Sequence, residues 1–278
     1  MQQTITVEVF FNLFIEELKQ NKNLRTYYKF LNNSSGLEFR KAYFCQRLQY
    51  IYDNIGEKTS KIWDCGCGYG TTAIFLALNG IATNGSTLEF YYQEIPKRLE
   101  YWKKYGDISL FTYNYEYFFD YKDSKNLYDT IILQDTLHHI EPLDEALKIF
   151  YNFLRPEGRM IMIEENGSNI IQKAKLYLRR GNNRVTSIYD EKLKKNIPFG
   201  NENIRRLNLW KKYFENADFK IVENKTQYIR LYPPVFFNKS NTEKLIFKEQ
   251  KLWRKSNFLR KYLFFGLHFI AKKQTTSI

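Results

Sequence analysis

The sequence is poor in cysteine, with Cys45, Cys65 and Cys67 the only three among 278 residues. Three cysteines, two of them in a Cys-x-Cys pair, do not make a disulfide framework, so we expect a reduced, cytoplasmic protein. The pair is also a candidate for metal binding, but it lacks partners at a ligand spacing. We therefore predict no bound metal.

Long apolar segments are also absent. No uncharged apolar run reaches the roughly 18 residues that a membrane-spanning helix needs. The first residues, MQQTITVE, lack a basic stretch before an apolar one, so we expect no signal peptide. No internal repeat or low-complexity tract is present. A chain of 278 residues is long enough for one sizeable core with extra segments around it, and we expect a single domain over residues 1–278.

Acidic residues are scarce in the second part of the chain. Residues 1–166 carry 18 lysines and arginines against 22 aspartates and glutamates, a net charge of −4. Residues 167–278 carry 25 against 8, a net charge of +17. A basic face attracts anionic partners at long range. An anionic membrane surface, an acidic carrier protein and nucleic acid are the candidate partners, and a basic surface that is only solvated is the alternative.

The sequence does contain a glycine-rich turn, in the segment KIWDCGCGYGTT at residues 61–72. This segment predicts a short strand, a tight turn through Gly66, Gly68 and Gly70, and a helix through residues 73–78. Glycines at alternate positions let the backbone turn sharply and approach a ligand closely. The turn also places N–H groups at a helix N-terminus, where the partial positive charge lies. The segment therefore predicts a cofactor pocket, with a turn that binds no ligand as the alternative.

The spacing of the turn argues against a dinucleotide. The fingerprint G-x-G-x-x-G requires glycine or alanine at its last position, where this chain has Thr71. The turn instead reads D-x-G-x-G-x-G from Asp64 to Gly70, which resembles motif I of class I S-adenosylmethionine-dependent methyltransferases. In that family the acidic residue lies near the methionine moiety of the donor, and the glycines accommodate its amino-acid and ribose parts. The resemblance implies that S-adenosyl-L-methionine is contacted by Asp64, Cys65, Gly66, Cys67, Gly68, Gly70 and Thr71.

The next segments match the family in order and spacing. An apolar run at residues 81–88 ends at Glu89, about twenty positions after the turn, where an acidic residue can accept bonds from both ribose hydroxyls. A glutamate that only stabilises a helix N-terminus is the alternative. A predicted helix at 90–105 and a predicted strand at 108–113 follow, and the family places adenine contacts after that strand. The resemblance thus adds Glu89, Phe90, Asn114, Tyr115 and Gln134 to the predicted cofactor site.

A second block lies at residues 128–140, YDTIILQDTLHHI. Its apolar run predicts a buried parallel strand, and polar residues follow where the carboxyl end of such a strand opens into a crevice. The block is similar to small-molecule, quinone-type methyltransferases, which often carry an LHH element here. An imidazole titrates near neutrality and suits a general base. We predict that His139 or His138 is the base, with at most one of them facing the site, and that Asp135 is an alternative base or orienting group.

The order of elements predicts a Rossmann-like α/β fold. Alternation of strands and helices from residue 61 to 165 indicates a doubly wound, mostly parallel sheet with helices on both faces. We expect a turn at residues 155–159, where Glu157 replaces a glycine of the family pattern, and then a strand at 160–164. A predicted helix at 209–217 and strand at 219–224 follow. Residues 264–272 resemble the family's closing antiparallel strand, so we expect seven strands.

The remaining segments surround this sheet. We expect an N-terminal helical cap over 1–60, the donor-binding core over 61–166, a basic helical insert or lid over 167–208, and the rest of the sheet with a basic tail over 209–278. The tail interleaves charged and large apolar residues, which predicts an amphipathic helix at a membrane interface or over the core. Residues 228–237 contain two prolines and are expected at the substrate entrance, with packing under the tail as the alternative. Residues 189–191 and 200–205 are candidate substrate contacts.

These features predict a cytoplasmic S-adenosylmethionine-dependent methyltransferase that acts on a small aromatic or lipid-like acceptor, presented at a membrane or on a carrier protein. The histidine pair favours O-methylation over C-methylation. An RNA or tRNA methyltransferase is an alternative that the basic half supports, although no Asn-Pro-Pro-Tyr or Asp-Pro-Pro-Tyr element follows the fourth strand. A non-catalytic donor-binding scaffold is the second alternative. The oligomeric state does not follow from the sequence.

Overall fold

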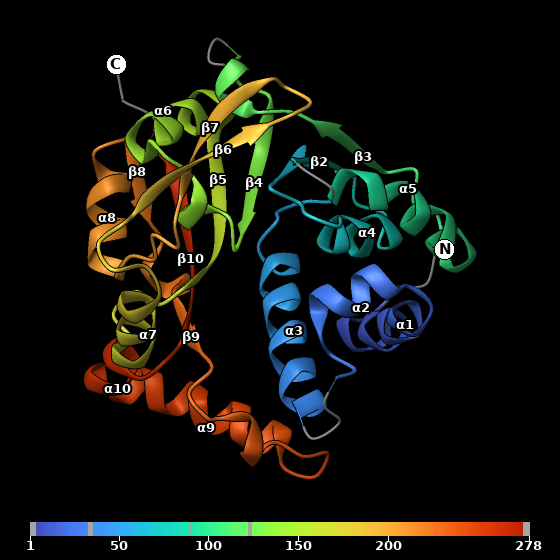
Figure 1. Cartoon of the computed structure of the whole chain (residues 1–278). Coiled ribbons are helices and arrows are strands. Elements are labelled where there is room, and N and C mark those ends of the chain that lie inside the picture. The colour runs from blue at the N-terminus through green and yellow to red at the C-terminus, as the bar shows by residue number, and fades with distance from the viewer. Residues whose placement is uncertain (1–3, 33–35, 89–90, 122–123, 275–278) are drawn as a thin grey trace.

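The computed structural model describes residues 4–32, 36–88, 91–121 and 124–274. Within this part the main sheet has the strand order β3-β2-β1-β4-β5-β10-β8, and β9 pairs with β10 (Figure 1). The strands are β1 (Ile62–Cys65), β2 (Thr83–Thr87), β3 (Phe111–Tyr115), β4 (Tyr128–Gln134), β5 (Leu154–Glu165), β8 (Phe219–Ile221), β9 (Gln227–Ile229) and β10 (Gly266–Lys273). Strands β1 to β5 run parallel, and β10 is antiparallel to its neighbours. This confirms the predicted Rossmann-like, mostly parallel sheet with an antiparallel closing strand. The described sheet has eight strands and not the seven expected, because β9 pairs with β10 beside the main order.

Helices cover both faces of this sheet (Figure 1). The described helices are α1 (Val7–Gln20), α2 (Lys22–Tyr28), α3 (Leu37–Tyr52), α4 (Thr71–Leu78), α5 (Tyr91–Trp102), α6 (Leu143–Phe153), α7 (Ile170–Arg180), α8 (Leu207–Glu215), α9 (Thr242–Lys255) and α10 (Asn257–Tyr262). Side chains on a strand alternate between the two faces. Ile131 and Leu133 therefore pack on the side of α6 and α8, whereas Ile132 between them packs on the side of α1, α3 and α4.

A buried ion pair ties the N-terminal helices to this sheet. Arg98 on α5 donates to both carboxylate oxygens of Glu17 on α1, at 2.8 and 2.6 Å, and the two side chains are almost fully buried. The other arm of Arg98 donates to the carbonyl oxygen of Tyr69 and to the hydroxyl of Thr71, both at 2.7 Å. Because Tyr69 and Thr71 follow strand β1, this guanidinium fixes the glycine-rich turn from behind.

The insert after β5 differs from the prediction of a helical segment. Only its first part is a helix, α7, and the rest is an antiparallel hairpin of β6 (Val185–Asp190) and β7 (Lys195–Gly200). The helix is set by an N-cap at Asn169, whose side chain accepts from the backbone N–H of Gln172. The hairpin is a short two-stranded ribbon with mixed pairs, among them Ile188 opposite Ile197 and Asp190 opposite Lys195. Such a mixed pattern is too weak to distinguish from a loop in the sequence.

The predicted turn at residues 155–159 lies inside a longer strand. Strand β5 begins at Leu154, and its register against β4 shifts between Tyr128 and Thr130, which accommodates an irregular stretch. Glu157, which stands where the family pattern has a glycine, adopts a positive φ of 60°. The backbone thus keeps the left-handed conformation that glycine would adopt without strain.

The basic tail forms helices, as predicted, and packs beside the sheet. Tyr43 of α3 donates to Glu249 of α9 at 2.8 Å, and the backbone N–H groups of Leu231 and Tyr232 donate to the same carboxylate. Segment 228–237 was expected at the substrate entrance, and its Arg230 lines the cavity at the carboxyl ends of the strands. Residues 233–236 are exposed, and Phe237 is buried against Tyr43. No helix in the described part of the chain has the length and apolarity that a bilayer-spanning segment needs.

Candidate functional site

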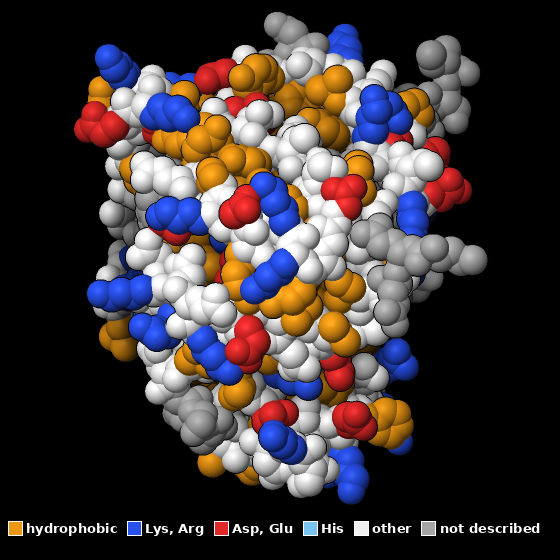
Figure 2. All heavy atoms as spheres, turned by 90° about the vertical axis from the view of Figure 1, so that its right-hand side faces the viewer, with side chains coloured by type: hydrophobic (Ala, Val, Ile, Leu, Met, Phe, Trp, Pro, Cys, Tyr) orange, Lys and Arg blue, Asp and Glu red, His pale blue; other side chains and the backbone are white. Residues whose placement is uncertain are grey.

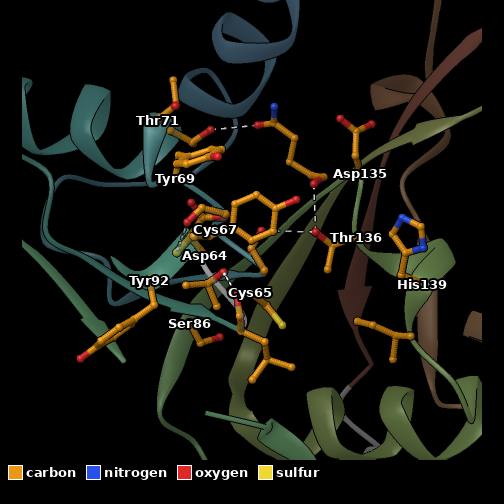
Figure 3. Close-up of a pocket in the computed structure, with 18 of the residues that line it drawn as sticks. Asp64, Cys65, Cys67, Tyr69, Thr71, Ser86, Tyr92, Asp135, Thr136 and His139 are labelled. Carbon is orange, nitrogen blue, oxygen red and sulfur yellow. Dashed lines mark hydrogen bonds between the residues drawn. The ribbon is translucent and has the colours of Figure 1, made fainter. Parts of the chain in front are cut away.

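A cavity of about 1090 Å³ opens at the carboxyl ends of the parallel strands. Its wall is built from the loops after β1, β2, β3 and β4, from α3, and from the β6–β7 hairpin. Figure 3 shows side chains from the glycine-rich turn on one side of this space, and Asp135, Thr136 and His139 on the other. The cavity therefore lies where ligands bind in open α/β sheets.

The glycine-rich turn has left-handed backbone at all three predicted glycines, with φ of 76° at Gly66, 54° at Gly68 and 73° at Gly70. A Cβ on Gly66 would come within 2.4 Å of Thr136, and one on Gly70 within 2.5 Å of Phe111. A Cβ on Gly68 would meet no described atom within 4 Å. Gly66 and Gly70 are thus required by packing, whereas Gly68 leaves open space on the cavity wall.

Asp64 is a buried carboxylate on the cavity wall. It is only 2% exposed, and burial raises its pKa to about 7. Its Oδ2 atom has no hydrogen-bond partner among the described residues. A buried acceptor without a protein partner is rare in native structures and marks a place for a ligand, an ion or an ordered water. The position therefore fits a ligand that brings a cationic or N–H group, such as the amino group of the predicted methyl donor.

The other predicted cofactor residues divide into three groups. Cys65, Cys67, Thr71, Tyr115 and Gln134 line the cavity, together with Asp64, Gly66 and Gly68. Gly70 and Asn114 belong to the same segments but are not part of the cavity wall among the described residues. Glu89 and Phe90 lie outside the described residues. The three cysteines are free thiols, which agrees with the absence of a disulfide framework.

Hydrogen bonds connect the two sides of the cavity floor. Thr72 at the start of α4 donates to Gln134 at the end of β4, at 2.9 Å. Thr136 donates to the carbonyl oxygen of Gln134, and its hydroxyl lies 3.5 Å from the carbonyl oxygen of Gly66. These bonds hold the end of β4 against the glycine-rich turn, so the two predicted blocks of the sequence form one site.

His138 is not part of the cavity wall among the described residues and is held by carboxylates. Its Nδ1 lies 2.6 Å from Glu164, and its Nε2 lies 3.6 Å from Glu202. Burial alone would lower the pKa of His138, but Glu164 and the other nearby carboxylates raise it to about 9. At neutral pH the ring is therefore protonated and has no lone pair to accept a proton. This geometry gives His138 a structural position between the sheet and the insert.

His139 lies on the cavity wall in the opposite protonation state. Its Nδ1 is 2.8 Å from the carbonyl oxygen of Gly200, which can only accept, so Nδ1 carries the hydrogen and Nε2 is the basic atom. Burial and the adjacent charge of His138 lower the pKa of His139. The ring stacks on Phe199 of the hairpin, with 4.4 Å between centroids. His139 is thus a neutral imidazole in a fixed tautomer beside the cavity.

Asp135 also lines the cavity, but it is paired. It adopts a positive φ of 51°, and its carboxylate accepts from Arg47 of α3. Burial would raise the pKa of Asp135, but Arg47 outweighs this and the net shift is downward. The carboxylate is therefore ionised and engaged, which suits an orienting role better than that of a base.

Several residues of the wall carry no signal in the sequence. Arg47 comes from the N-terminal cap and Arg230 from the segment after β9, where it bonds Glu165 at 2.7 and 2.5 Å. The remaining wall is strongly aromatic, because cap and hairpin contribute Tyr27, Tyr28, Phe30, Phe39, Tyr43, Phe44 and Phe199. Their apolar character indicated only burial, and no pattern in the sequence distinguishes cavity wall from core at these positions.

One group of metal-type ligands exists among the described residues. Single ligand atoms of His138, His139 and Glu202 lie within 4.8 Å of one another. The carboxylate of Glu202 is already shared between His138, at 3.6 Å from Nε2, and Arg179, at 3.5 Å. We interpret this group as a hydrogen-bonded cluster that joins the loop after β4 to the hairpin.

Comparison with known proteins gives a family match. A family model described as a methyltransferase domain matches residues 37–224. No match is found among curated proteins. The matched range runs from the start of α3 to the region after β8 and contains the glycine-rich turn, the end of β4 and the hairpin.

Solved structures agree in fold at low identity. An S-adenosylmethionine-dependent methyltransferase from Methanosarcina mazei has a TM-score of 0.54 and 14% identity, covering 81% of this chain and 98% of that chain. Another such methyltransferase, from Archaeoglobus fulgidus, has a TM-score of 0.52 and 14% identity, covering 82% of this chain and 91% of that chain. The 1,6-didemethyltoxoflavin-N1-methyltransferase of Burkholderia thailandensis, solved with its acceptor and S-adenosylhomocysteine, has a TM-score of 0.50 and 12% identity, covering 94% and 86%.

Proposed function

The chain belongs to the methyltransferase domain family, and we propose that it transfers the methyl group of S-adenosyl-L-methionine to the oxygen of a small, ring-containing or lipid-like acceptor. The observation that carries this proposal is the pairing, across one cavity, of an unpartnered buried carboxylate at Asp64 with a neutral imidazole at His139. The first fits the amino group of the donor, and the second fits the removal of an acceptor proton.

The residues of the turn fit the donor. Asp64 would accept a hydrogen bond from the amino group of the donor. Gly68 leaves room for the amino-acid part of the donor to approach the turn. Tyr115 lines the cavity at the end of β3, where the family has its adenine contacts. When bound, the donor supplies an activated methyl group on a positively charged sulfur.

The remaining wall supports the choice of acceptor. The cap and the hairpin enclose the cavity with aromatic rings, which favour a planar or apolar molecule over a polymer. His139 offers Nε2 as the acceptor of a hydroxyl proton, because its Nδ1 is occupied by Gly200. Asp135 and Arg47 neutralise each other and orient this end of the cavity. Holding the acceptor in line with the methyl carbon would supply much of the rate.

The variant His139→Asn tests the base. Asparagine can still donate to the carbonyl oxygen of Gly200 but has no basic nitrogen, so we expect the methylation rate to fall by about 10²-fold or more. Binding of S-adenosylhomocysteine, measured by calorimetry, should stay unchanged. An unchanged rate would contradict O-methylation through His139 and favour C-methylation of an electron-rich ring. Cleavage of the labelled product by hydriodic acid separates the two, since it releases methyl iodide from O-methyl groups and not from C-methyl groups.

A further inference from the structure

Helix α7 exposes an apolar stripe to solvent. Within this helix only Leu176 is buried, whereas Ile170 is 53%, Ile171 57%, Tyr177 64% and Leu178 87% exposed. Residues seven and eight positions apart lie two turns apart on the same side of a helix. The four side chains therefore form one continuous stripe along α7, and the fold itself gives no reason for it.

Cations border this stripe on both sides. At 100° per residue, Lys175 and Arg179 fall on one flank of the stripe, and Lys173 and Arg180 fall on the other. The helix contains no acidic residue. An apolar face between two rows of lysine and arginine is the pattern of helices that lie in the plane of a membrane interface.

A basic groove of about 530 Å³ lies beside the helix. Five cations and one acidic residue line it in the described part of the chain, and that residue, Glu141, already bonds Arg205 at 2.7 Å. The cations are Lys173, Arg180, Arg184, Arg205 and Arg206. The hydrogen bonds that Arg180 makes to described residues are long ones, to the backbone carbonyl oxygens of Asn183 and Glu202 at 3.4 and 3.3 Å. Its buried Nε has no partner in the described part of the chain, so the groove has an excess of unmatched positive charge.

The neighbouring tail continues the same character. Asn169 at the start of α7 donates to the carbonyl oxygen of Leu263 just after α10, which places the two helices side by side (Figure 1). Phe258 of α10 is 63% exposed and lies near Arg260 and Lys261 in the sequence. The opposite side of the molecule differs, since Figure 2 shows acidic and basic side chains interspersed there.

We propose that α7 and the basic groove beside it form a docking surface for the anionic lipid surface of a membrane. The stripe from Ile170 to Leu178 enters the interface between headgroups and acyl chains, and the flanking cations contact lipid phosphates. Charge complementarity selects an anionic partner, and the exposed isoleucines and leucine select lipid over nucleic acid, whose phosphates offer them no apolar contact. Arg180 leads directly through residues 181–184 into the hairpin that lines the first cavity, so docking brings the cavity close to the lipid.

Vesicle co-sedimentation of the full chain tests this surface without any methyl transfer, so its outcome is independent of the proposed function. Vesicles of phosphatidylglycerol in phosphatidylcholine should bind the chain, and vesicles of phosphatidylcholine alone should not. Salt should weaken the binding, because the attraction to headgroups is screened. The variants Leu178→Asp and Ile171→Asp should bind these vesicles with an affinity lowered by at least about tenfold.

The matched control is Val9→Asp, which replaces an apolar side chain 49% exposed on α1, in the acidic half, with the same added charge. It should bind vesicles as the parent chain does, and circular dichroism should show all three variants folded. The proposal would be overturned if Val9→Asp lost as much vesicle binding as the two α7 variants, or if the parent chain did not bind anionic vesicles. A parent chain that binds RNA and not the vesicles would also overturn it. In that case RNA binding should be lost when Arg180 and Arg184 are both changed to glutamine.

Discussion

The Nδ1 atom of His138 lies 2.6 Å from the carboxylate of Glu164, and both side chains are buried. Glu164 also accepts from the backbone N–H of Leu137, so this carboxylate fixes the start of the segment that carries His139. The charge on His138 in turn helps to keep His139 neutral. Two adjacent histidines thus occupy opposite protonation states because one faces carboxylates and the other faces a carbonyl oxygen and the cavity.

This pair predicts a stability loss in alkali. The pKa of His138 is about 9 in the folded chain and about 6.5 when unfolded. Because the folded chain holds this proton more tightly than the unfolded chain, protonation of His138 stabilises the fold. This stabilisation is complete below pH 6.5 and is lost as the pH rises through 9. We expect up to roughly 3 kcal/mol from this source, measured as the free energy of urea unfolding against pH. The variant His138→Gln should show a flatter curve over this range.

His268 provides the comparison within the same chain. It is buried, neither ring nitrogen has a partner among the described residues, and burial lowers its pKa to about 3. Below pH 6.5 the unfolded chain binds a proton at His268 that the folded chain does not, so this residue destabilises the folded chain in acid. The variant His268→Phe should remove that part of the acid destabilisation. An alkaline effect in His268→Phe, or none in His138→Gln, would contradict the assigned protonation states.

Asp64 predicts opposite effects on stability and on donor affinity. Its folded pKa of about 7 means that ionisation opposes folding, so Asp64→Asn should stabilise the chain without ligand at pH 8. The same change removes the proposed acceptor for the donor's amino group, and affinity for S-adenosylhomocysteine should fall about tenfold or more. In the parent chain this affinity should rise with pH up to about 7 as the carboxylate ionises. Calorimetric titration measures the affinity, and thermal unfolding measures the stability.

Gly68 and Gly80 form a matched pair for the placement of the pocket. Both have positive φ, 54° and 77°, and at neither would a Cβ meet a described atom within 4 Å. Replacement by aspartate should therefore cost both variants a similar backbone strain of about 1–2 kcal/mol. Only Gly68→Asp should abolish donor binding, because only Gly68 lies on the cavity wall. Equal affinity of the two variants for S-adenosylhomocysteine would refute this position of the donor.

Arg98 predicts a large stability effect far from the acceptor. The change Arg98→Met leaves Glu17 as a buried charge without its partner, and should cost about 3–5 kcal/mol of unfolding free energy. Lys103→Met removes an exposed pair with Glu100 and should cost less than about 1 kcal/mol. Denaturant unfolding distinguishes the two. Similar losses of unfolding free energy in the two variants would contradict a stabilising role for the buried pair of Arg98 and Glu17.

The sheet and the turn could be predicted from the sequence because their signals are local. The glycines at 66, 68 and 70 and the apolar run before Gln134 each define an element within a few residues, and the parallel topology brings them to one edge. The register irregularity near Glu157 was hidden, since glutamate at a left-handed position carries no sequence signal of its own. The hairpin was hidden as well, because a short ribbon of mostly exposed residues without regular alternation resembles a loop.

The partners of the site residues could not be predicted. Whether His138 or His139 faces the cavity depends on Glu164 and Gly200, which lie 26 and 61 positions away in the sequence. Arg47 reaches Asp135 across 88 positions. Such contacts arise from the packing of elements that the sequence pattern describes only one at a time. The prediction of a histidine on the site therefore named two candidates, and the hydrogen bonds of the folded chain distinguish them.

The most direct test follows the methyl group. The purified chain is incubated with methyl-labelled S-adenosyl-L-methionine and a cell extract, and the label is measured in small-molecule, RNA and protein fractions. We predict label in the small-molecule fraction with the parent chain and with Gly80→Asp, and none with Gly68→Asp. Label confined to RNA, or no label anywhere despite measurable donor binding, would contradict a small-molecule methyltransferase.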